Sequence, residues 1–137
     1  MADKHSEPGK LILCIDDEPV ILMAMAMELR KSFGREYIIE TATTLGDLLE
    51  LAGDYRGDGV ELSCVISDWI MPGAKGEDVA AALRALSPGL PVLLMTGHAE
   101  TEAAERSIGQ GGPYAILRKP WRNKELVERL NELLGKR

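Results

Sequence analysis

The sequence has few aromatic residues, only two cysteines and no long apolar run. Aromatic residues make up 4% of the 137 residues, so the core is left to aliphatic side chains and methionine. Cys14 and Cys64 lie inside the apolar runs LILCI and LSCVI, which predicts buried reduced thiols rather than a metal or redox pair. No segment approaches the roughly 18 apolar residues of a membrane span.

A strong basic charge is also missing. Asp and Glu number 22 against 16 Lys and Arg, a formal net charge of -6, which argues against nucleic acid as a direct partner. The first residues, MADKHSEPG, lack the apolar stretch of a signal peptide, so we expect a cytoplasmic protein. The length suits one domain, which we place at 10–135 after a polar tail at 1–9.

Five short apolar runs alternate with five helical stretches along the chain. The predicted strands are 11–15, 37–41, 62–67, 92–95 and 114–117, and the predicted helices are 19–33, 45–55, 77–86, 100–108 and 122–134. Glycines 53, 57 and 59 predict a loop after the second helix, and 71–76 reads as a turn-rich loop.

Strict alternation, with strands that are apolar on both faces, predicts an α/β fold with a parallel five-stranded sheet covered by helices on both sides. We expect a flavodoxin-like (βα)5 three-layer sandwich with strand order 2-1-3-4-5. In such sheets ligands bind beyond the carboxyl ends of the strands.

Polar residues follow four of the five strands directly. They are Asp16 and Asp17 after the first strand, Asp68 after the third, Thr96 after the fourth and Lys119 after the fifth. The predicted fold brings these ends to one rim. Three crowded carboxylates repel, by roughly 4 kcal/mol per pair at about 4 Å and an effective dielectric near 20, so a cation is expected among them.

An all-oxygen cluster suits Mg²⁺, and a lysine adds a fixed positive charge. Together with a hydroxyl and a carboxylate nucleophile, these are the parts needed for phosphoryl transfer to aspartate. Each residue taken alone has a simpler interpretation: a favourable helix dipole, a turn, a helix cap or a solvated lysine. Their joint occurrence at four strand ends favours the functional interpretation.

The chain resembles the receiver domains of two-component response regulators, the single-domain chemotaxis type included. The motifs that carry the resemblance are IDDE at Asp16 and Asp17, SDWIMPGAKG around Asp68, MTG at Thr96 and KPW at Lys119. The ending KPW, with Trp121, is similar to that of receivers attached to cyclic-di-GMP phosphodiesterases or hybrid kinases. We expect Trp121 to pack against its own C-terminal helix.

The resemblance implies a role for each of these positions. Asp68 would accept the phosphoryl group; Asp17, Asp68 and the backbone carbonyl of Ile70 would bind Mg²⁺; Asp16 would hold the ion through water; Thr96 and Lys119 would contact phosphoryl oxygens; and the Lys119–Pro120 bond would be cis.

The resemblance also implies partners. A histidine kinase or phosphotransfer protein would donate the phosphoryl group, and a downstream effector or a fused output domain would respond. A homodimer through the face of the fourth helix, fifth strand and fifth helix is a further possibility. No enzymatic activity is expected beyond self-phosphorylation and self-dephosphorylation.

The sequence departs from the usual receiver pattern at Ile116, Ile70 and His98. Ile116 replaces an aromatic residue that rotates in many receivers, and Tyr114 is expected to be a half-exposed edge residue. Ile70 cannot orient an attacking water, which predicts slow self-hydrolysis unless His98 compensates.

In the first predicted helix, Met23, Met25 and Met27 do not share one helical face, so no methionine-rich docking stripe is expected.

Two other functions compete with this interpretation. A phosphatase with an aspartate nucleophile, of the haloacid-dehalogenase type, needs a D-x-D signature after the first strand and a cap, and the sequence has neither. A degenerate receiver would serve only for docking or dimerisation, but such domains have typically lost some of the site residues that this sequence keeps.

Overall fold

The computed structural model describes residues 9–97, 99–108 and 111–135. The predicted tail at 1–9 therefore lies almost wholly outside the described residues, as does His98. The strands are β1 (Lys10–Ile15), β2 (Tyr37–Ala42), β3 (Glu61–Asp68), β4 (Ile70–Met71), β5 (Ala74–Lys75), β6 (Val92–Thr96) and β7 (Tyr114–Arg118). The helices are α1 (Pro19–Phe33), α2 (Leu45–Gly57), α3 (Gly76–Leu86), α4 (Thr101–Ile108) and α5 (Asn123–Leu133).

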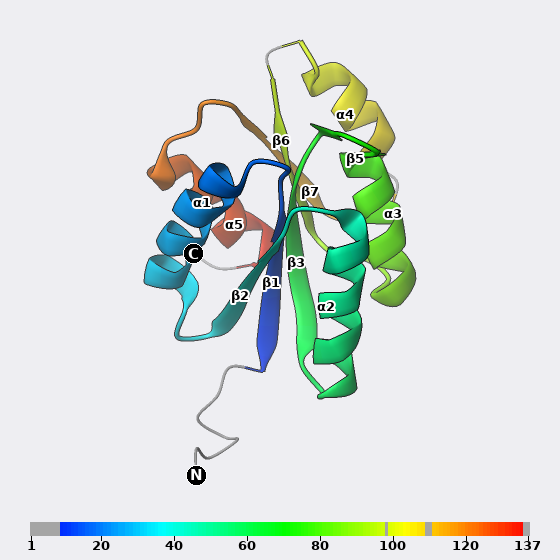
Figure 1. The fold of residues 1–137 in the computed structure, drawn as a ribbon. Helices are drawn as coiled ribbons and strands as arrows, with labels where there is room; N and C mark the ends of the chain where they lie inside the picture. The colour runs from blue at the N-terminus through cyan, green and yellow to red at the C-terminus, as the bar shows by residue number, and fades with distance from the viewer. Residues whose placement is uncertain (1–8, 98, 109–110, 136–137) are drawn as a thin grey trace.

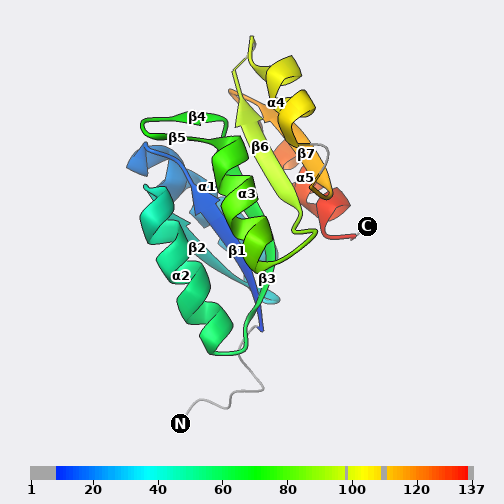
Figure 2. The same cartoon turned by 90° about the vertical axis from the view of Figure 1, so that its right-hand side faces the viewer.

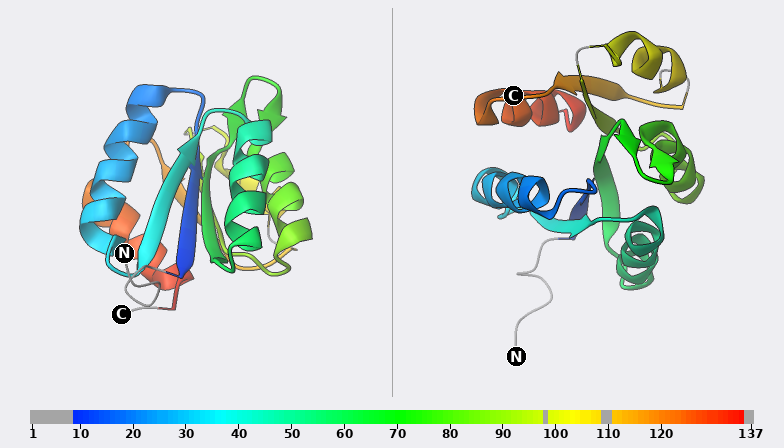
Figure 3. Two further views of the ribbon diagram at one scale, coloured as in Figure 1. Left: turned by 60° about the horizontal axis from the view of Figure 1, so that its bottom comes forward. Right: turned by 45° about the horizontal axis from the view of Figure 1, so that its top comes forward.

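The main sheet has five parallel strands in the order β2-β1-β3-β6-β7, which confirms the predicted 2-1-3-4-5 topology. Helices α1 and α5 cover one face and α2, α3 and α4 cover the other, as Figure 1 and the right panel of Figure 3 show. The result is the three-layer arrangement expected when parallel strands are buried on both faces.

The central strands supply both halves of the core in alternation. In β1, Leu11, Leu13 and Ile15 join the cluster under α2, α3 and α4, whereas Ile12 and Cys14 join the cluster under α1 and α5. This two-residue period follows from strand geometry. Because the apolar run ends where the strand ends, the next polar residue emerges at the rim.

Two local predictions were wrong. The helix α2 continues through Gly53 to Gly57, because the burial of Leu48 and Ala52 on its inner face outweighs the low helix propensity of glycine. The loop predicted at 71–76 contains a short antiparallel hairpin, in which Ile70 pairs with Lys75 and Met71 with Ala74. Figure 2 shows this β4–β5 hairpin apart from the main sheet.

Other local predictions are confirmed. Cys14 and Cys64 are buried free thiols, and burial raises the pKa of Cys64 to about 12. The Lys119–Pro120 bond is cis. Trp121 is partly buried against the core on the α1 and α5 side, and its packing against α5 in particular stays a prediction.

The prediction that the three methionines of α1 do not share one helical face is confirmed. Met25 is buried, and it is therefore on a different face from Met23 and Met27. However, Met23 and Met27 lie one turn apart and are exposed, as is Val20, at 66%, 70% and 77% respectively. We call Val20, Met23 and Met27 the α1 apolar stripe.

Candidate phosphorylation site

The first part of the site is the acidic pair after β1. Asp16 is fully buried where the strand ends, and its Oδ1 accepts a hydrogen bond of 3.0 Å from the backbone N–H of Glu18. Asp17 is exposed. Pro19 then opens α1, where its missing N–H costs nothing. The strand end and the helix start thus turn one carboxylate inward and leave the other at the surface.

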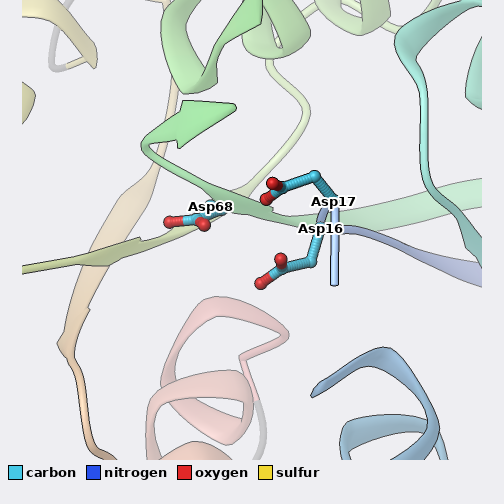
Figure 4. Close-up of side chains that lie close together, drawn as sticks. All are labelled: Asp16, Asp17 and Asp68. Atoms are coloured by element: carbon cyan, nitrogen blue, oxygen red, sulfur yellow. The ribbon is translucent and has the colours of Figure 1, made fainter. Parts of the chain in front are cut away.

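Asp68 is the last residue of β3, the neighbour of β1 in the sheet, and it is 7% exposed. Carboxylate oxygens of Asp16, Asp17 and Asp68 lie within 4.8 Å of one another. Figure 4 shows the three side chains gathered beyond the strand ends. The predicted convergence of residues some 50 positions apart is therefore present.

Lys119 is the residue that follows β7, and its side chain reaches the acidic cluster. Its Nζ donates a hydrogen bond of 2.8 Å to Asp68 Oδ2 and lies 3.7 Å from Asp16 Oδ2. Its backbone N–H donates to the carbonyl of Thr96 at 2.9 Å, which fixes the start of the Lys119 segment beside the end of β6. One ammonium group thus contacts two of the three carboxylates in the cluster.

Burial and the neighbouring charges together shift two pKa values in the site. Burial raises the pKa of Asp16, and the nearby Asp68 adds to that effect, against the hydrogen bond from Glu18 and the charge of Lys119. Burial alone would lower the pKa of Lys119, but the hydrogen bond to Asp68 and the charges of Asp68 and Asp16 raise it overall. Lys119 is therefore a fixed cation at neutral pH, and Asp16 carries an ionised form that its surroundings disfavour.

The residues fit a divalent cation. Asp16 Oδ2 is buried and accepts no hydrogen bond from the residues that the structure describes, which is a costly state for a carboxylate oxygen. It belongs to a cluster of three carboxylates that one lysine does not neutralise. Oxygen-only clusters of this kind suit hard cations such as Mg²⁺.

The structure brings Thr96 to the same rim but not into contact with Asp68. Thr96 is the last residue of β6 and is fully buried. Its hydroxyl hydrogen-bonds the hydroxyl of Thr101 at 3.1 Å, and among the described residues it has no other partner. Sequence reasoning did not single out Thr101, because a threonine at a helix start is ordinary.

The remaining predicted positions have clear locations. Ile70 opens β4 two residues after Asp68, and its side chain is 51% exposed. Ile116 is partly buried against the core on the α4 side. Tyr114 is 39% exposed on the edge strand β7, as expected. His98 lies outside the described residues.

The fold and the site together define a receiver module with an acidic pocket and a lysine, a composition consistent with a phosphoacceptor. The family model of the response regulator receiver domain matches residues 12–131. The chain therefore belongs to the response regulator receiver domain family, whose members are typically signalling modules without enzymatic activity of their own.

Several curated relatives and solved structures are similar to the chain. A protein named as a probable transcriptional regulatory protein, TcrX of Mycobacterium tuberculosis, is 34% identical over 123 residues, which are 90% of this chain and 49% of TcrX. The C4-dicarboxylate transport regulator DctD of Rhizobium meliloti is 32% identical over 85% of this chain and 24% of its own length. The sensor kinase CckA of Brucella abortus is 27% identical over 91% of this chain and 12% of its own.

Among structures, a response regulator receiver domain from Clostridium thermocellum superposes with a TM-score of 0.77 at 25% identity, covering 92% of this chain and 94% of that one. The receiver domain of an HD domain-containing protein from Pseudomonas fluorescens gives 0.74 at 26%, covering 98% and 92%. The chain spans half or less of the length of the three curated relatives. In two of them, a kinase and a transcriptional regulator, a receiver is one part of a larger protein.

Proposed function

We propose that Asp68 accepts a phosphoryl group and that the change of charge there switches the conformation of the domain. The observation that carries the proposal is the position of the Asp68 carboxylate. It lies at the rim of the sheet with the Lys119 ammonium at 2.8 Å and two further carboxylates within 4.8 Å. A nucleophile, a fixed cation and a cation-binding cluster therefore meet at one point.

The transfer forms one bond and breaks one. A carboxylate oxygen of Asp68 bonds to phosphorus, and the bond from phosphorus to the donor's imidazole nitrogen breaks. The nitrogen keeps the electron pair and takes a proton from water. Mg²⁺, when bound, neutralises charge on the phosphoryl oxygens.

The chain's own residues then divide the work. Asp17, Asp68 and the carbonyl of Ile70 would hold the ion, and Asp16 would hold it through water. Lys119 pairs with one phosphoryl oxygen, because its raised pKa keeps it charged. The Thr96 hydroxyl donates to another once it turns away from Thr101. In this scheme the domain catalyses only its own phosphorylation and dephosphorylation.

The donor is a histidine kinase or a phosphotransfer protein. The α1 apolar stripe supports a protein donor, because it starts three residues after Asp17 and presents exposed apolar side chains on the helix that opens at the site. Exposed apolar groups beside a reactive site are typical of a contact surface. The side chain of Ile70, two residues after Asp68, is also exposed.

The receiver passes the signal to a downstream effector or to an output domain on the same polypeptide. A homodimer through α4, β7 and α5 is the further partner that we propose, and direct contact with nucleic acid or membrane is not part of the proposal. No helix of the described residues is long and apolar enough to cross a membrane. We place the protein in the cytoplasm, where Cys14 and Cys64 stay reduced. The single-domain chemotaxis type and the KPW subclass stay predictions.

A degenerate receiver is the second candidate. It would dock partners without phosphorylation, and the occupied Thr96 hydroxyl would suit such a fixed state. The complete set of Asp16, Asp17, Asp68 and Lys119 favours the phosphoacceptor, because three clustered carboxylates beside one lysine, with a buried oxygen that accepts no hydrogen bond from the described residues, are costly and have no purpose in a docking module. A phosphatase is a weaker candidate still, since residues 9–97, 99–108 and 111–135 form no cap over the site.

Beryllium fluoride, a phosphoryl mimic that binds carboxylates, tests the proposal. We expect titration with Mg²⁺ to shift the amide NMR signals of residues around Asp68, Thr96 and Lys119 in the wild-type protein. Asp68→Asn should abolish the shifts. Asp54→Asn, at an exposed aspartate on α2, is the matched control and should behave as wild type. Equal shifts in wild type and Asp68→Asn would contradict the proposal.

A further inference from the structure

The Thr96 hydroxyl and the Gly97 N–H, at the end of β6, are both hydrogen-bonded to side chains at the start of α4. The Thr96 hydroxyl bonds the Thr101 hydroxyl at 3.1 Å. The backbone N–H of Gly97 donates to Glu100 Oε1 at 2.7 Å. Glu100 in turn donates its own backbone N–H to the Gly97 carbonyl at 3.2 Å. The β6–α4 connection is thus closed by reciprocal bonds.

The packing around these bonds is close. Thr96 is fully buried, so its hydroxyl has no access to water as an alternative partner. A Cβ built on Gly97 would lie 3.0 Å from Glu100 Oε1, which shows how tightly the carboxylate sits on the backbone. Buried hydroxyls and N–H groups that lose a partner destabilise the state that contains them.

These groups lie next to the phosphoacceptor. Asp68 is paired with Met95 in the sheet, and Thr96 and Gly97 are the next two residues. A phosphoryl group on Asp68 adds about 1.5 to 2 negative charges and three strong acceptor oxygens, which attract hydroxyl and N–H donors. It also repels a carboxylate. Glu100 and Thr101 therefore compete with the phosphoryl group for the same two donors.

The other end of α4 is held firmly. Arg84 of α3 donates hydrogen bonds to the carbonyls of Ile108 at 3.1 Å, Pro113 at 3.0 Å and Leu90 at 3.0 Å. Ile108 is the last residue of α4. A change at the start of α4 is therefore confined to its first turns, because its end is tied to α3 and to the segments before β6 and β7.

We propose that Glu100 and Thr101 form a latch that holds the resting state, and that phosphorylation of Asp68 releases the start of α4 by taking Thr96 and Gly97 from them. The inference rests on the proposed function of Asp68. It assigns to this chain two positioning residues that set how much of the active conformation exists before phosphorylation. The latch opposes phosphorylation, so its removal strengthens the response.

Simple helix capping would give the opposite sign. If the two side chains only stabilise α4, their loss leaves the affinity for a phosphoryl mimic unchanged or lowers it. If they form the latch, their loss destabilises the resting state alone and raises that affinity. One neutral hydrogen bond is worth about fivefold in an equilibrium constant, and a bond to a carboxylate more.

The experiment is a beryllium fluoride titration in Mg²⁺, followed by NMR, on the full chain. We expect Thr101→Val to bind about fivefold more tightly than wild type, and Glu100→Ala to gain more than that, because it removes a bond to a carboxylate. Without beryllium fluoride, the amide signals of Thr96 and Gly97 should already move toward their bound positions. Thr101→Ser keeps the hydroxyl and should match wild type.

Glu102→Ala is the matched control for charge, because it removes a carboxylate from the first turn of α4 that makes no hydrogen bond among the described residues. It should change affinity little. If Thr101→Val and Glu100→Ala bind no more tightly than wild type, the latch is overturned, while wild-type binding that is lost in Asp68→Asn leaves the proposed function standing. A wild-type chain that does not bind overturns both.

Discussion

Two connections border the site, and they are built differently. The segment from Asp68 to Gly76 is anchored by backbone bonds: Trp69 donates to the Met95 carbonyl at 2.9 Å and Gly76 to the Trp69 carbonyl at 2.7 Å. Trp69 and Met71 are buried in the core. In the β6–α4 connection, the described residues carry backbone bonds from Lys119 to the Thr96 carbonyl and from Glu100 to the Gly97 carbonyl, but the Thr96 hydroxyl and the Gly97 N–H are bound by the two side chains of the latch.

The difference separates two tasks. A nucleophile has to be held in place, because small displacements from the reactive geometry are costly in rate. A switch has to change partners, and bonds worth about 0.5–1.5 kcal/mol net can be exchanged for bonds to a phosphoryl group. The β3–α3 connection holds Asp68 still, and the β6–α4 connection responds.

The largest effect is expected from breaking the fixed connection at Gly76. A Cβ there would lie 2.6 Å from Leu94 Cδ2 and 3.1 Å from the Asp68 carbonyl oxygen, so Gly76→Ala should destabilise the fold by about 2–3 kcal/mol and weaken Mg²⁺ binding. Urea unfolding and a Mg²⁺ titration measure both.

Gly53→Ala is the matched control for that change. Gly53 is exposed within α2, and nothing lies within 4 Å of a Cβ built there. The substitution should stabilise the protein by about 0.5–1 kcal/mol. A Gly76→Ala protein as stable as wild type would show that the connection is not fixed.

The next largest effect is expected on the free energy of unfolding when the buried carboxylate of Asp16 is neutralised. Asp16→Asn should raise the stability of the metal-free protein at pH 7 by about 1–2 kcal/mol and lower its Mg²⁺ affinity. The raised pKa of Asp16 means that its ionisation costs the folded state more than the unfolded state.

The sign of the pH dependence follows from that shift. As the pH rises from the ordinary aspartate pKa of 3.8 through the raised pKa of Asp16 in the folded state, ionisation of Asp16 lowers the stability of the wild-type protein. The advantage of Asp16→Asn should therefore vanish below the ordinary value and grow above it. Unfolding curves across the acid range would show this, and an advantage that persists at the lowest pH would contradict it.

A smaller effect is expected for the lifetime of the phosphate. Ile70 is exposed beside Asp68 and has no group to orient an attacking water, so we expect slow self-hydrolysis. Ile70→Asn supplies a hydrogen bond to that water, worth about fivefold in rate. Loss of the phosphoprotein after donor removal measures the lifetime. A wild-type half-life of only seconds would contradict the prediction.

The smallest effect is expected at Ile116. Its side chain already packs against the core on the α4 side, so Ile116→Phe should alter the response to beryllium fluoride only modestly. Chemical shift changes at the start of α4 measure that response. Their loss in Ile116→Phe would show that coupling runs through this position rather than through Thr101.

Sequence reasoning located the site because the site follows directly from the strand ends. Apolar runs end where strands leave the core, so Asp16, Asp68 and Lys119 could be placed at one rim without coordinates. The latch could not be found in this way, because the contact between Thr96 and Thr101 depends on the path of the β6–α4 turn and on side-chain rotamers.

The other errors have similar causes. The strands of the β4–β5 hairpin have only two residues each, which is too short for a periodic pattern. The glycines around them predicted a loop instead. The α1 apolar stripe was missed because the methionines were judged as a set of three, whereas burial separates Met25 from Met23 and Met27. In both cases the missing information was which neighbour each side chain faces.

Direct phosphorylation is the most decisive measurement. Incubation of the protein with a small phosphoryl donor and Mg²⁺, followed by intact mass spectrometry, should show the mass of one added phosphoryl group. The addition should be absent in Asp68→Asn and with a chelator in place of the metal. An equal addition in Asp68→Asn, or none in the wild type, would contradict the assignment of Asp68 as the phosphoacceptor.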